Sequence, residues 1–159
     1  MIQWIARVVA GLVILALVAI VAGGVAVRTA DHDPAVWHLR PATAERTGKP
    51  NDFLAAPAGT TTATVDVTLA PTDAAAAMTA FDTAARAASR VAVVAGSVEE
   101  GFITYVQRSA LIGFPDYISV ETVEGGIAIW SRSRYGHSDL GVNEKRVRAW
   151  LAEAGLSSG

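Results

Sequence analysis

The chain has 159 residues, a formal net charge of −2 and no cysteine, which excludes disulfides, thiol nucleophiles and cysteinyl metal sites. All of the acidic residues and all but two of the Lys and Arg residues follow position 28, so the chain beyond that point is net negative. This balance gives no polybasic signal, and we expect no nucleic-acid partner.

An uninterrupted apolar run extends from Val8 to Val27, between Arg7 and Arg28. A helix over this run would span about 30 Å, which matches the hydrocarbon core of a bilayer. A cleaved signal peptide has a shorter apolar stretch of about 7–15 residues, so we expect a retained transmembrane anchor over residues 1–28. The arginines that follow the run favour a cytoplasmic domain, but whole domains can be translocated regardless of flanking charge.

Residues 29–60 are rich in turn signals and show little periodicity, which is typical of a linker. This range also holds Trp37, Phe53 and Leu54, and fully solvated linkers seldom carry such side chains. We therefore expect the linker to pack on the domain. One alternative is that Trp37 rests in the membrane interface.

From residue 61 to 69 apolar and polar side chains alternate, which predicts a half-buried strand. A helix is expected next, with Thr72 as its N-cap and Met78 and Phe81 on its inner side. Asp82 and Arg86 are placed to form an outward i,i+4 pair.

The remaining elements are four predicted strands and a final helix that begins at an Asn143 N-cap. The strands cover residues 90–95, 102–110, 117–123 and 127–134. Residues 61–159 thus predict one α+β domain of the order strand, helix, four strands, helix. We expect a mostly antiparallel sheet with both helices on one face.

Four segments resemble one known family. They are WHLRP, PNDFLAAP, LIGFPDYISV and IWSRSRYGHSDLGVNEKRVRAWL, and the resemblance covers roughly residues 31–154. Together they resemble the domain of unknown function 1499 family, especially its membrane-anchored bacterial members. The resemblance implies an uncharacterised domain that is often exported or membrane-attached. We therefore expect a single-pass protein of the bacterial inner membrane with an extracytoplasmic domain.

One departure from the family concerns His137, where members more usually have Tyr. A site that accepts Tyr at this position has no need of an imidazole proton shuttle.

The candidate site is a set of polar residues near the end of the last predicted strand. Arg132 and Arg134 are two residues apart and share one face of that strand. Converging guanidinium groups beside a helix start could hold a carboxylate or a phosphate. The alternative is that Arg132 and Arg134 pair with Asp116 and Asp139 and hold the loop 136–141. The full candidate set is Arg108, Arg132, Arg134, Tyr135, Asp139, Asn143 and Arg146.

Catalytic and metal chemistry have weaker support. Ser133, His137 and Asp139 have the residue types of a nucleophilic triad, but they lie within seven positions and lack a glycine-flanked nucleophile. We expect the histidines and aspartates of the segment 31–38 to be solvated residues next to the membrane, and not metal ligands. We expect no metal and no cofactor.

The leading hypothesis is a non-enzymatic, membrane-anchored binding or assembly module of the bacterial envelope. It would take a protein partner or a small anionic ligand at the segment from Arg132 to Asn143. The alternative is a hydrolase that acts on envelope or lipid substrates. A third hypothesis is a scaffold that shelters an apolar ligand between its sheet and the last helix.

Overall fold

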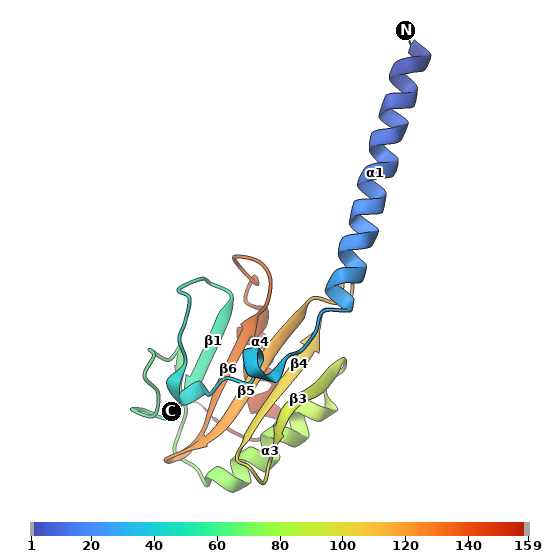
Figure 1. Ribbon diagram of the computed structural model, residues 1–159. Helices are drawn as coiled ribbons and strands as arrows, with labels where there is room; N and C mark the ends of the chain where they lie inside the picture. Colours follow the sequence, from blue (N-terminus) through green and yellow to red (C-terminus); the bar gives the residue numbers. More distant parts are fainter. Residues whose placement is uncertain (1, 158–159) are drawn as a thin grey trace.

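A six-stranded sheet organises the polypeptide beyond its N-terminal helix, and the computed structural model describes residues 2–157 (Figure 1). The first residue of the expected anchor and the last two residues of the expected domain lie outside this range. The strands are β1 (Asp52–Ala56), β2 (Val67–Thr68), β3 (Val91–Ser97), β4 (Phe102–Arg108), β5 (Pro115–Val123) and β6 (Gly126–Ser133). The helices are α1 (Ile2–Arg28), α2 (Pro34–Trp37), α3 (Ala74–Ala87) and α4 (Val142–Glu153), with a 3₁₀ turn η1 (Pro41–Thr43).

Helix α1 projects away from the sheet as one continuous rod (Figure 1). Its segment Gln3–Arg28 is long and apolar enough to cross a membrane, and none of its most apolar window is buried against the rest of the chain. Helix length and hydropathy alone are shared by membrane anchors and by signal sequences near an N-terminus.

The strands lie in the order β2-β1-β6-β5-β4-β3, and every neighbouring pair is antiparallel except β1 and β2. Helices α3 and α4 both pack on one face of this sheet. Their buried side chains, among them Phe81 and Trp150, meet the inward side chains of β4, β5 and β6 in the main core. The predicted α+β class with a mostly antiparallel sheet is confirmed.

Both long helices of the domain begin at residues other than the expected ones. The N-cap of α3 is Asp73, whose carboxylate accepts a hydrogen bond from the Ala76 amide at 2.7 Å, and not Thr72. The N-cap of α4 is Gly141, and Asn143 lies fully buried in the first turn of that helix. Asn143 is drawn inward because its side chain has buried polar partners on β6.

Sequence reasoning placed no strand before residue 61, but β1 lies there and is paired on both sides. Of the strand predicted over 61–69, only the part near its end forms a strand, which is β2. The alternation remains visible in the burial of side chains, since Ala63 and Val65 are partly buried against the cluster of Ala44, Leu54 and Trp130. The ladder ends at Asp66 because its carboxylate accepts from the Leu54 amide at 2.8 Å and its own amide donates to the Leu54 carbonyl at 2.8 Å.

The second face of the sheet is also covered. Residues 30–46, called the strap from here on, lead from the end of α1 across this face and include α2 and η1. Figure 1 shows the blue strap in front of the sheet, with α3 and α4 behind it. The strands must therefore carry, on the face that the strap covers, side chains that can be buried under a segment with little regular secondary structure.

Candidate functional site

Aromatic stacking fixes the strap on the sheet. The Trp37 indole lies 3.9 Å from the Tyr117 ring and is nearly parallel to it, at 7°. The His38 ring lies 3.7 Å from the Phe102 ring. Tyr117 and Phe102 come from neighbouring strands, so the two stacks hold two successive strap residues across β4 and β5.

Arg132 lies beneath the strap with only 6% of its surface exposed. Its Nη2 donates to the Trp37 carbonyl at 2.5 Å, its Nη1 donates to Ser119 Oγ at 3.2 Å, and the guanidinium lies 4.2 Å from the centre of the Trp130 ring. No ion pair within residues 2–157 involves this side chain. Burial lowers the pKa of Arg132 to about 10, so the group remains charged at neutral pH.

Arg108 and Arg134 also bond the backbone of the chain that crosses this face. Arg134 Nη1 donates to the Asp31 carbonyl at 2.6 Å, and Arg108 Nη1 donates to the Val27 carbonyl at 3.1 Å. The three arginines thus bond three carbonyls of the strap and the end of α1. They give side-chain donors to carbonyls of a segment that crosses the sheet without pairing to a strand.

His32 connects two of these arginines through Tyr117. Arg108 Nη2 lies 2.7 Å from His32 Nε2, and because an arginine can only donate, Nε2 must accept. His32 Nδ1 then donates to the Tyr117 hydroxyl at 2.8 Å, and Arg134 Nη1 donates to the same hydroxyl at 3.2 Å. Burial, with the charges of Arg108 and Arg134, lowers the pKa of His32 below its ordinary value of 6.5.

Arg146 and Asn143 lie on the opposite face of the sheet, under α4. Arg146 forms an ion pair with Asp116 at 2.6 Å and donates to Gln107 Oε1 at 2.5 Å. Asn143 Oδ1 accepts from Arg146 Nη1 at 2.5 Å and from Ser131 Oγ at 2.6 Å. This network joins the first turn of α4 to strands β4, β5 and β6.

The sheet therefore divides the residues that the sequence grouped as one site. Arg108, Arg132 and Arg134 lie on the strap face, and Asn143 and Arg146 lie on the helix face. The expected pairing of Arg132 and Arg134 with Asp116 and Asp139 is wrong. Alternation along β6 and β5 directs the two arginines away from Asp116, which Arg146 neutralises instead.

Asp139 and Tyr135 lie in the connection between β6 and α4. The Asp139 carboxylate accepts from the backbone amides of Gly141 at 2.9 Å and of Asn143 at 2.7 Å, so it caps the start of α4. The Tyr135 ring is 42% exposed and lies 5.9 Å from the Phe114 ring.

The three residues of the hypothetical triad do not converge. Ser133 Oγ accepts a hydrogen bond from Asn143 Nδ2 at 3.0 Å, and Asp139 is engaged as the helix cap. His137 is exposed, and among the described residues no hydrogen bond joins it to Ser133 or Asp139. Within residues 2–157 no cluster of His, Asp and Glu side chains is arranged to hold a metal ion.

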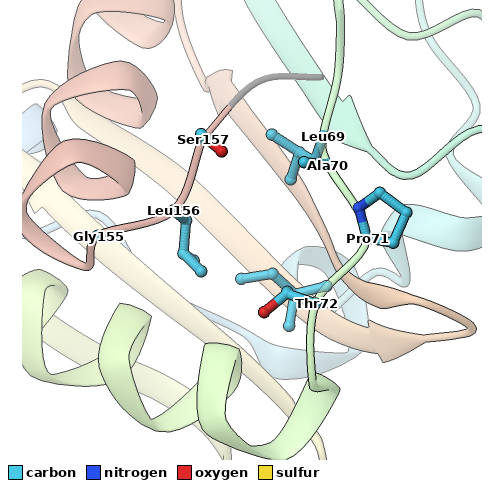
Figure 2. A pocket seen from close by; sticks show the side chains of 8 residues that line it. Leu69, Ala70, Pro71, Thr72, Gly155, Leu156 and Ser157 are labelled. Atoms are coloured by element: carbon cyan, nitrogen blue, oxygen red, sulfur yellow. The ribbon is translucent and has the colours of Figure 1, made fainter.

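Three hollows lie near α4. Figure 2 shows the smallest one, of about 120 Å³, between the segment from Leu69 to Thr72 and the segment from Gly155 to Ser157. A second one, of about 240 Å³, is lined by Phe53 and Val67 of the sheet and by Leu151 of α4. Both volumes are below the roughly 300–1,000 Å³ of typical ligand pockets, so they give little room for the apolar ligand of the third hypothesis.

The largest one, of about 480 Å³, is a charged cleft beside the connection from β6 to α4; Arg46, Asp52, Asp66, Asp139, Glu144 and Arg148 line it.

Sequence reasoning missed Trp37, Tyr117 and His32 as parts of the arginine cluster. One signal was present: Tyr117, Ser119 and Glu121 alternate with the core residues of β5 and give its second face aromatic and polar side chains. A strand with two distinctive faces indicates that both faces are covered, and the strap is the segment that covers the second one.

These observations define a small α+β domain behind an N-terminal helix that could span a membrane. Residues 43–153, well over half of the chain, match the family described as protein of unknown function (DUF1499), and the chain belongs to that family. The match begins in η1 and ends with α4, so it includes β1. No curated protein and no solved structure matches the chain.

Replacement of Arg132 by Ala should lower the free energy of unfolding by about 2 kcal/mol, because it removes a buried side chain whose guanidinium bonds the Trp37 carbonyl and Ser119 Oγ between the strap and the sheet. Urea unfolding of the full-length protein in detergent measures the effect. Arg148→Ala is the matched control, since Arg148 is exposed and its contacts are an i,i+4 pair with Glu144 and a cation–π contact 5.5 Å from the centre of the Phe53 ring. Equal midpoints for the two variants would contradict a structural role of Arg132.

The free energy of unfolding should fall as the pH is lowered from about 7.5 to about 5.5. The pKa values of His32 and His38 are both lowered in the folded protein, so below about 6.5 the unfolded chain binds more protons. Denaturant titrations at several pH values measure the slope. His32→Gln and His38→Gln should each reduce it, and an unchanged slope in both variants would refute this assignment.

Proposed function

We propose that the chain is a non-enzymatic binding module, tethered to a membrane by α1, that takes a protein partner at residues 135–142, called the Tyr135–Val142 loop below. The observation that carries the proposal is Leu140. Its side chain is 87% exposed, and its backbone is in the left-handed region with φ 55°. That conformation costs a residue with a Cβ about 1–2 kcal/mol, and no burial of the side chain offsets it.

The Tyr135–Val142 loop is held at both ends, which supports a role in recognition. Asn51 Nδ2 donates to the Gly136 carbonyl at 2.9 Å, and the Asp139 amide donates to the Pro50 carbonyl at 3.3 Å. The Asp139 carboxylate then ties the loop to α4. A strained backbone conformation is kept only where the surrounding contacts hold it in place, and such residues concentrate at functional sites.

The surroundings of Leu140 match a protein partner better than a small anion. Val142 is 46% exposed beside it, and the charged cleft of about 480 Å³ adjoins them through Ser138 and Asp139. Apolar side chains next to polar and charged groups are the usual composition of a protein interface.

The arginines give less support to an anionic ligand. Arg132 is buried under the strap, and Arg108 and Arg134 donate to carbonyl groups of the same chain. An anion would have to displace the strap to reach Arg132. The hydrolase alternative has no converging nucleophile and base to support it.

The binding test places a photoreactive residue at Ser138 in full-length protein in bacterial membranes. A discrete adduct is expected from Ser138 and none from the same residue at Thr79, which is exposed on α3. Leu140→Gly should abolish the adduct and leave the free energy of unfolding within about 0.5 kcal/mol of the original or higher, because glycine accepts a positive φ. An adduct that persists at full yield in Leu140→Gly would overturn the proposal.

We also place the domain on the extracytoplasmic face of the bacterial inner membrane, with α1 as its single span. The exported members of the family support this side. Alkaline phosphatase fused after the last residue should be active in cells, because it folds only outside the cytoplasm, and a reporter that is active only in the cytoplasm serves as the control. Activity of the cytoplasmic reporter alone would reverse the orientation.

A further inference from the structure

The connection from β4 to β5, residues 109–114, lies at the end of the sheet where α1 joins the domain (Figure 1). We call it the Ser109–Phe114 loop. It exposes three large apolar side chains: Leu111 is 87% exposed, Ile112 47% and Phe114 38%. Three such residues within four positions form a patch, and a patch of this kind on a soluble surface marks a site of interaction.

The same three side chains lie alongside α1. Together with residues between Ala19 and Arg28 they line a groove of about 590 Å³. Ala19 precedes the end of the apolar run at Val27 by about 12 Å of helix rise. The loop is therefore level with the last turns of the segment that is apolar enough to cross a membrane.

Three successive carbonyl groups of the loop accept hydrogen bonds from arginine side chains. Arg28 Nη2 donates to the Leu111 carbonyl at 2.9 Å, and Arg28 Nε donates to the Ile112 carbonyl at 3.2 Å. Arg108 Nη1 donates to the Gly113 carbonyl at 3.0 Å. Exposed loops commonly leave such carbonyls to water.

Ser109 adds three further bonds within the loop. Its hydroxyl oxygen accepts from the amides of Gly113 at 3.1 Å and Phe114 at 3.0 Å, and its amide donates to the Phe114 carbonyl at 2.9 Å. Internal partners for backbone groups lower the cost of bringing a loop towards the lipid chains, because the hydrocarbon layer supplies neither donors nor acceptors. A loop that faced water or a polar partner surface would not bear this cost.

We propose that the Ser109–Phe114 loop inserts into the interfacial layer of the bilayer that α1 crosses, with Leu111, Ile112 and Phe114 among the lipid chains. This inference rests on the proposed membrane tether. The loop and α1 then form one membrane-binding unit, and the domain sits on the bilayer at a fixed height.

The absence of cysteine makes a direct test possible, since a single introduced cysteine takes a unique fluorescent label. Full-length protein is reconstituted into vesicles of phosphatidylethanolamine and phosphatidylglycerol. The label is placed by Leu111→Cys in the loop, by Leu15→Cys in the middle of α1, or by Glu124→Cys in the exposed turn at the opposite end of β5. Lipids that carry a quencher near the headgroup or near the chain end report the depth of each label.

The label at Leu111 should be quenched most by the shallow lipid, the label at Leu15 by the deep lipid, and the label at Glu124 by neither. If the labels at Leu111 and Glu124 behave alike while that at Leu15 is quenched, the loop does not insert and the tether stands. If the label at Leu15 is also unquenched, the tether itself fails. A Leu111 label that is shielded from water but unquenched by lipid would indicate a protein neighbour and would overturn the inference.

Discussion

The buried guanidinium of Arg132 is the group on which the arrangement of the chain depends. It lies between the sheet and the strap without an ion-pair partner among the described residues. Its charge is stabilised by the hydrogen bond to the Trp37 carbonyl and by the cation–π contact with the Trp130 ring. A buried cation is stable only when its donors are bonded, so the strap must cross the sheet at this point. With Trp37 fixed, the stack on Tyr117 and the path of the chain back to α1 follow.

Arginine side chains repeat one role along this path. Arg132, Arg134 and Arg108 each bond a main-chain carbonyl of the strap or of the end of α1, and Arg28 bonds carbonyls of the Ser109–Phe114 loop. A guanidinium has five donors in a rigid plane, which suits it to carbonyls that no neighbouring strand pairs. The result is a domain held directly against the end of its N-terminal helix.

Two connections at this end of the sheet differ in their backbone chemistry. The Ser109–Phe114 loop is bonded internally and displays apolar side chains beside α1, which suits it to lipid. The Tyr135–Val142 loop displays Leu140 beside a charged cleft, which suits it to a protein. A partner recruited by the second loop would meet the domain close to the membrane surface, at a height that the first loop sets.

The sequence by itself determined the apolar helix, the α+β class, the inner face of α3 and the family, because these depend on local periodicity, composition and short motifs. Only the tertiary structure decided that β1 belongs to the sheet, since its pairing to Val67 and to Trp130 is non-local. It also decided which face each polar residue occupies relative to its partners. Arg132 and Arg146 are close in sequence, yet they lie on opposite faces of the sheet. A local sequence pattern does not show which segments cover the two faces.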